Sequence, residues 1–89
     1  MLQHEFTRTF LKDMKRWRKA GKSMQPFEDF LLTIRETWPP APKYEAHVLV
    51  GSLSGIWDIH LRQNWIVLAR FESGVVRFLR MGTHAELSL

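Results

Sequence analysis

The sequence predicts an α+β fold in which two helices pack on one face of an antiparallel sheet, and three observations support this class. Apolar residues recur every three or four positions from residue 6 to residue 38, as in amphipathic helices. From residue 44 to residue 81 they alternate instead, as in strands. The links between the expected strands are too short for crossover helices, so consecutive strands must pair antiparallel. We therefore expect the order β-α-α-β-β-β-β.

Length and composition limit the kind of protein this is. A chain of 89 residues that is 45% hydrophobic and 12% aromatic predicts one folded domain over residues 1–89. The absence of cysteine excludes disulfides and thiolate metal ligands. No stretch is apolar and long enough for a membrane span, and no signal pattern opens the chain, so we expect a soluble cytoplasmic protein without a membrane partner. The net charge of +4 favours an anionic partner.

The first elements are a short strand and a basic helix. Residues 1–6 alternate weakly and predict a strand, and a helix is expected from about Thr7 to Ala20, where Gly21 can take the left-handed cap. One face of this helix is apolar. The other faces carry seven cations against the single acid Asp13: Arg8, Lys12, Lys15, Arg16, Arg18, Lys19 and Lys22. This surface is either a solvated helix face or a site for nucleic acid or an acidic protein.

A second helix is expected between Ser23 and Trp38. Ser23 is a suitable N-cap, and Pro26 suits a first turn. The following pair Pro39-Pro40 ends the helix, because a residue before proline disfavours helical angles. The two helices then form an αα-hairpin.

Four strands complete the expected fold, at residues 44–50, 56–62, 65–72 and 75–81. Glycine, serine and asparagine occupy the links between them, which favours turns. The third of these strands begins at Trp65 and is apolar on both faces, as a central strand would be.

Three histidines and an arginine are the candidate chemical groups. Asp58, His60 and Arg62 share one face of their strand, and His47 lies on the preceding strand. Arg80 and His84 lie one hairpin further along, around a glycine turn. A meander could bring all three imidazoles together.

Two chemistries use three imidazoles. One is a zinc site with a position open for water, but a fixed arginine charge beside a dication costs energy. The other is metal-free RNA cleavage, in which one histidine is the base, another is the acid and Arg80 stabilises the phosphorane. We favour the second, with His60 or His47 as base and His84 as acid, and we expect neither a metal nor another cofactor.

A resemblance covering nearly the whole chain adds context. Its motifs are Tyr44-x-x-His47-x-Leu49-x-Gly51, Asp58-Ile59-His60, Asn64-Trp65 and Arg80-x-Gly82-Thr83-His84-x-x-Leu87. In these motifs and in the expected element order the chain resembles the YafQ branch of the RelE/ParE superfamily, the toxins of bacterial type II toxin–antitoxin pairs.

The resemblance implies a RelE/ParE-like fold and an endoribonuclease that cuts messenger RNA in the 30S A site of the ribosome and is silenced by an antitoxin. We expect the antitoxin to be acidic. His47, His60 and His84 match the catalytic imidazoles of the family, and Arg80 matches its phosphate-stabilising arginine. The residues expected to contact RNA or the ribosome are Lys12, Lys15, Arg16, Lys19, Lys22, Arg62 and Trp65.

The chain departs from the family pattern at three positions. Asn64 replaces an aspartate and is included among the catalytic candidates, Ser88 replaces an aromatic residue, and Val48 replaces a lysine. These changes predict weakened or altered catalysis. Besides the endoribonuclease, two other classes of function stay open. One is a binding module, either a ParE-like toxin that poisons a protein target or a degenerate toxin that engages only its antitoxin. The other is a small metal-dependent enzyme.

Overall fold

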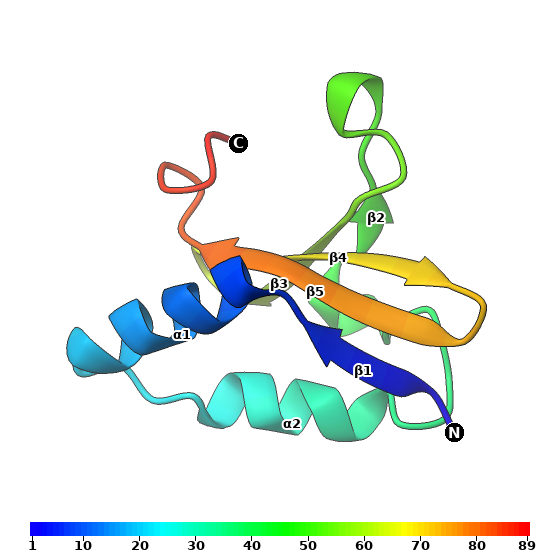
Figure 1. The fold of residues 1–89 in the computed structure, drawn as a ribbon, viewed down its shortest axis with the longest axis horizontal. Helices are drawn as coiled ribbons and strands as arrows, with labels where there is room; N and C mark the ends of the chain where they lie inside the picture. Colours follow the sequence, from blue (N-terminus) through cyan, green and yellow to red (C-terminus); the bar gives the residue numbers. More distant parts are fainter.

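The order of elements in the computed structural model, which describes residues 1–89, is the predicted β-α-α-β-β-β-β with two short 3₁₀ turns added (Figure 1). The elements are β1 (Gln3–Phe6), α1 (Arg8–Lys19), α2 (Gln25–Thr33), η1 (Pro42–Tyr44), β2 (His47–Val48), η2 (Gly51–Leu53), β3 (Trp57–Arg62), β4 (Trp65–Glu72) and β5 (Val75–Gly82). No helix has the length and apolar character needed to cross a membrane.

The sheet has the strand order β1-β5-β4-β3-β2. Strands β2 to β5 form the predicted antiparallel meander. Strand β1 pairs with β5 in parallel, contrary to the prediction of a wholly antiparallel sheet. The argument from short connections applies only to consecutive strands, and β1 and β5 lie at opposite ends of the chain.

Both helices lie on the same side of the sheet (Figure 1). Phe78 of β5 is fully buried there, and its ring lies 5.5 Å from that of Phe10 on α1 and 5.3 Å from that of Phe27 on α2. At the other end of α1 the rings of Trp17 and Trp65 stack 4.9 Å apart. The predicted helical hairpin therefore encloses an aromatic core, with Trp65 on a central strand as expected.

Three predictions about where elements begin or end are wrong. Helix α2 ends at Thr33 and not at Trp38, because Trp38 instead stacks on Phe71 of β4 at a centroid distance of 5.1 Å. The N-cap of α2 is Met24, while the hydroxyl of Ser23 accepts a hydrogen bond from the Gln25 amide. The strand expected at residues 44–50 is reduced to His47–Val48, because Tyr44 belongs to η1 and Glu45, which follows it, has a left-handed φ of 46°.

Helix α1 also completes the outer edge of β5. Strand β1 pairs with β5 only as far as Phe78. Beyond Phe78, the backbone groups on this edge of β5 have no strand partner. The hydroxyl of Thr7 donates to the carbonyl of Leu79, and a carboxylate oxygen of Asp13 accepts from the Met81 amide. Buried backbone groups require such partners, which explains an aspartate that is only 2% exposed.

Candidate functional site

The pairing register places the predicted site residues in two adjacent rows across the sheet. One row runs from His47 through Asp58 and Leu68 to Arg80, and the next runs from His60 through Ile66 to Gly82. Side chains of directly paired residues lie on the same face of a sheet. The sheet therefore brings to one face groups that are up to 33 residues apart in sequence, as in the row from His47 to Arg80.

This face is the one that the helices do not cover. Leu68 in the first row and Ile66 in the second are buried but lie outside the core cluster that packs against the helices, so they form an apolar floor between the polar residues of β3 and the end of β5. The C-terminal turn, which carries His84, and the η2 segment both project from this side of the sheet (Figure 1).

The three imidazoles form a line. The ring of His60 lies 6.1 Å from that of His47 and 5.7 Å from that of His84, centroid to centroid. His47 is on the edge strand β2, and His84 follows β5, so the two outer rings approach His60 from opposite sides. The predicted meeting of the three histidines is confirmed in this geometry.

The proton position on His47 follows from its neighbours. Its Nδ1 lies 3.0 Å from the carbonyl oxygen of Glu45, and because a carbonyl only accepts, Nδ1 must carry the hydrogen. In the neutral ring, Nε2 then keeps its lone pair, 4.0 Å from Oδ2 of Asp58. Glu45 has φ 46°, a left-handed conformation that is uncommon outside glycine and asparagine.

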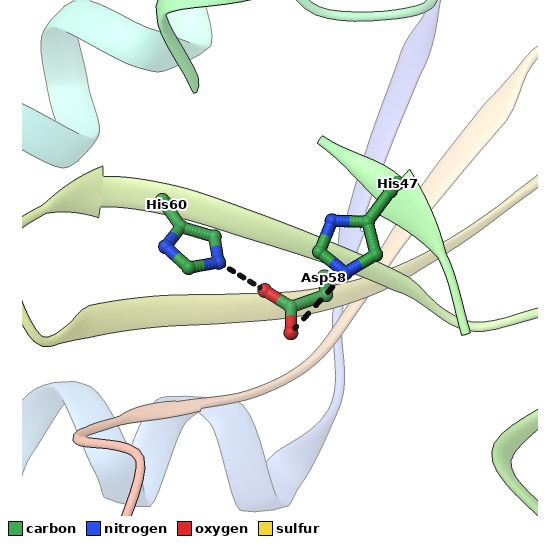
Figure 2. Close-up of side chains that lie close together, drawn as sticks. All are labelled: His47, Asp58 and His60. Carbon is green, nitrogen blue, oxygen red and sulfur yellow. Dashed lines mark ion pairs between the residues drawn. The ribbon is translucent and has the colours of Figure 1, made fainter. Parts of the chain in front are cut away.

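Asp58 was placed on the polar face from sequence but was given no role. It is 6% exposed and lies between two histidines, with Oδ1 3.0 Å from His60 Nε2 (Figure 2). This is an ion-pair contact without hydrogen-bond alignment, and Oδ1 has no hydrogen-bond partner. The sequence signal was its spacing of two from His60, which puts both side chains on one face of β3.

His84 is oriented by Asn64. Oδ1 of Asn64 lies 3.0 Å from the His84 backbone nitrogen and 2.9 Å from His84 Nδ1. The backbone N–H can only donate, so the atom facing it must be the amide oxygen, and Nδ1 must also donate to it. The Nε2 atom of His84 is then free to exchange a proton with a ligand.

A reciprocal capping box holds the turn that carries His84. The Thr83 amide donates to Oε1 of Glu86 at 2.8 Å, and the Glu86 amide donates to the hydroxyl of Thr83 at 3.1 Å. Arg16 of α1 lies 3.3 Å from Oε2 of Glu86. The hydrogen bond from the Thr83 amide and the charge of Arg16 together lower the pKa of Glu86 despite partial burial.

Arg80 is held in place by Asp13, a contact that was not predicted from the sequence. Nε of Arg80 donates to Oδ2 of Asp13 at 2.8 Å, and Nη1 of Arg16 donates to Oδ1 at 2.8 Å. Burial raises the pKa of Asp13, but hydrogen bonds from Arg80, the Met81 amide and Arg16 outweigh it and leave the pKa below its ordinary value. The hydrogen bond from Arg80 to Asp13 raises the pKa of Arg80.

The guanidinium of Arg80 remains partly exposed, so N–H groups that do not face Asp13 can bind an anion. The sequence clue to the contact between Asp13 and Arg80 was that Asp13 is the single acid among seven cations, three residues before Arg16.

The predicted RNA contacts divide into three groups. Lys12, Lys15, Lys19, Lys22 and Arg62 are exposed, although Lys22 lies over the ring of Trp17 at 3.9 Å. Arg16 is exposed but bonded to Asp13 and Glu86. Trp65 is only 4% exposed and stacks on Trp17, which contradicts the prediction that it contacts RNA. Its large apolar ring is needed in the core.

Comparisons with known proteins agree with this fold. The family described as "Bacterial toxin of type II toxin-antitoxin system, YafQ" matches residues 2–89. The mRNA interferase toxin YafQ of Escherichia coli K12 is 34% identical over 84 residues, which cover 93% of this chain and 91% of the relative.

Solved structures give the same result. The E. coli DinJ-YafQ complex contains a chain 34% identical to this one, with a TM-score of 0.84 and 98% of both chains covered. A metal-bound toxin from Helicobacter pylori is 28% identical, with a TM-score of 0.85, covering 98% of this chain and 99% of the other. From the match over residues 2–89 and the identity to the E. coli toxin, this chain belongs to the YafQ family of bacterial type II toxin–antitoxin toxins.

Proposed function

We propose that the protein is an endoribonuclease that cleaves messenger RNA on the ribosome without a metal ion. The observation that carries this proposal is the line of three imidazoles beside an arginine that a buried aspartate holds in place. Support for RNA as the substrate comes from the name of the E. coli relative, an mRNA interferase toxin.

In this mechanism His47 is the base. Its neutral ring offers the Nε2 lone pair, because Nδ1–H is bonded to the Glu45 carbonyl. That lone pair takes the proton of a ribose 2′-hydroxyl, whose oxygen attacks the adjacent phosphorus. His60 lies between the two outer rings and contacts the carboxylate of Asp58, so it is placed beside the reacting phosphate.

His84 is the acid. When protonated, it keeps the Nδ1–H bond to Asn64 and presents Nε2–H to the departing 5′-oxygen. His47 and His84 flank His60 from opposite sides, which suits an in-line displacement where base and acid act across the phosphorus. Arg80 stabilises the negative charge of the phosphorane. The products are a 2′,3′-cyclic phosphate and a 5′-hydroxyl.

The test is incubation of the purified protein with translating ribosomes and, in parallel, with the same RNA free in solution. We expect cleavage of the ribosome-bound messenger, and we expect His84→Ala to reduce its rate by about 10² to 10⁴ fold, the range for losing a general acid. His4→Ala is the matched control, since His4 is on β1 and bonds the Ile34 carbonyl. A parent that cleaves neither RNA would favour the binding-module alternatives.

We also propose an acidic antitoxin as the partner. An E. coli relative of this chain is found in the DinJ-YafQ complex, and the lysines of α1 have little counter-charge within this chain. The one acid of that helix, Asp13, is already bonded to two arginines and a backbone amide. An acidic segment would supply the missing charge.

A further inference from the structure

We propose that Arg70 binds the RNA phosphate that lies one nucleotide upstream of the cleaved bond. This subsite rests on the proposed function above, because the course of the RNA over the protein follows from the roles given to His47 and His84. Arg80 serves the reacting phosphate, whereas Arg70 holds the neighbouring part of the strand and takes no part in the reaction.

Arg70 lies on the same face of the sheet as the proposed catalytic groups. It follows Leu68 by two positions on β4, and alternate residues of a strand share a face. Leu68 belongs to the row that joins His47 to Arg80, so Arg70 is one row further along β4, a displacement of about 7 Å for two residues of strand. A long arginine side chain can therefore reach a phosphate next to the one at the histidines.

The charge of Arg70 is not neutralised within the chain. Arg77, its partner in the pairing of β4 with β5, forms an ion pair with Glu5 at 3.1 Å. Arg70 is exposed and forms no ion pair, although Glu72 lies two residues further along the same face. An exposed guanidinium without a carboxylate partner suits the planar, two-point recognition of a phosphate.

Gly55 shows in which direction the Arg70 side chain extends. A Cβ on Gly55 would lie 3.1 Å from Nη1 of Arg70, so the guanidinium packs against this glycine, where a side chain would crowd it. Gly55 lies just before β3, and the carbonyl of the next residue, Ile56, accepts from the Leu49 amide and continues the pairing of β2 with β3. Arg70 is therefore directed toward the β2 side of the sheet, which carries His47.

The proposed mechanism gives the bound strand a direction. The ribose whose 2′-hydroxyl attacks lies at His47 on β2, and the departing 5′-oxygen lies at His84 after β5, so the RNA runs from β2 toward the C-terminal turn. The phosphate on the 5′ side of the attacked ribose then lies on the His47 side of the reacting phosphate. Arg70 offers a free charge on that side, so it binds the upstream phosphate and not the downstream one.

Titration with uncleavable dinucleotides, followed by NMR of the backbone amides, tests the subsite without requiring activity. The probes are three deoxythymidine dinucleotides: one with only its internal phosphate, one with an added 5′-phosphate and one with an added 3′-phosphate. We expect the 5′-phosphate to strengthen binding by about threefold or more, and Arg70→Gln to abolish this gain. The gain should persist in Arg35→Gln, since Arg35 is exposed in the segment that follows α2.

The two phosphorylated probes carry the same charge at opposite ends, so they separate a placed phosphate from general attraction. A 5′-phosphate that adds no affinity in the parent, or a gain that survives Arg70→Gln, would overturn the proposal. Equal dependence of the 5′- and 3′-phosphate probes on Arg70 would overturn it as well.

A second arm separates strand binding from the reaction by the kinetics of messenger cleavage on ribosomes. Arg70→Gln should raise KM while kcat stays within about twofold of the parent, because the contact is the same in the ground state and the transition state. An unchanged KM, or a fall in kcat of about tenfold or more, would overturn the role of Arg70 as a strand-binding residue. If the parent cleaves no RNA, the proposed function fails, while the dinucleotide titrations still decide whether Arg70 binds a phosphate.

Discussion

Asn64 shows how one side chain can replace another in shape while changing its chemistry. It has φ 57°, a left-handed turn conformation that asparagine tolerates well. From that position its amide oxygen accepts from both nitrogens of His84 that face it. We therefore propose that Asn64 positions His84, the proposed acid, and does not itself transfer a proton.

This role predicts the effect of two substitutions. Asn64→Asp keeps an oxygen at the same place, so it should raise the rate of single-turnover cleavage by no more than about tenfold. Asn64→Ala should lower that rate by about 10 to 100 fold, because His84 loses its orientation. Affinity for the ribosome should hardly change in either variant. A rise of 10² fold or more in Asn64→Asp would instead assign proton transfer to this position.

Asp58 and Asp13 mark the limit of sequence reasoning at the residue scale. The three histidines and Arg80 were found because imidazole and guanidinium groups suggest chemistry wherever they gather. A carboxylate becomes informative only when it is buried, and burial depends on neighbours from other strands and helices. The two aspartates are 6% and 2% exposed, and no pattern within their own segments states this.

At the scale of elements, α1 does more than carry a basic surface. Asp13 and Arg16 connect it to Arg80 on β5 and to Glu86 in the turn that carries His84. The proposed phosphate-binding group and the proposed acid are thus held by the same helix.

Asp13→Asn should destabilise the protein by about 2 kcal/mol near neutral pH, because charged hydrogen bonds are lost and the new amide nitrogen faces only donors. The pKa of Asp13 is lowered on folding, so its stabilisation is complete above the ordinary aspartate pKa and is lost as pH falls through the folded value. The difference between parent and variant should therefore shrink in acid. Urea unfolding at several pH values measures it.

Asp29→Asn is the control for that experiment. Asp29 is exposed and bonds only the side chain of Gln25, so its substitution should change stability by less than about 0.5 kcal/mol. Equal effects of the two substitutions would refute the role given to Asp13.

The capping box predicts a local change in acid. The pKa of Glu86 is lowered, so its bond to the Thr83 amide should persist below the ordinary glutamate pKa of about 4.3 and be lost at still lower pH. The amide resonance of Thr83 followed by NMR should titrate in that range in the parent but not in Glu86→Gln. Titration at or above the ordinary value would contradict the capping geometry.

At the scale of the whole molecule, periodicity and connection length were enough to predict the element order and the meander. They could not predict the parallel pairing of β1, because it joins the two ends of the chain and no local pattern encodes it. They also overestimated α2, since the apolar spacing that continues to Trp38 reflects packing of that ring on Phe71.

The net charge of +4 leads to an expectation about the antitoxin. Its affinity should fall as salt rises from about 50 to 500 mM, because the charges that α1 offers are solvent-exposed and are screened. Replacing Lys12 and Lys15 with glutamine should reduce this salt dependence, and replacing Arg35 and Lys43, outside α1, should not. Affinity that is independent of salt would rule out an electrostatic interface.

The chemistry of the RNA ends is the most direct test of the central claim. Messenger cleaved on ribosomes, in the presence of magnesium and of a chelator selective for transition metals, should carry a 2′,3′-cyclic phosphate on the upstream fragment and a 5′-hydroxyl on the downstream fragment. These ends require attack by the 2′-hydroxyl on the adjacent phosphorus. A 3′-hydroxyl with a 5′-phosphate, or cleavage that stops when the selective chelator is added, would contradict the mechanism built on His47, His84 and Arg80.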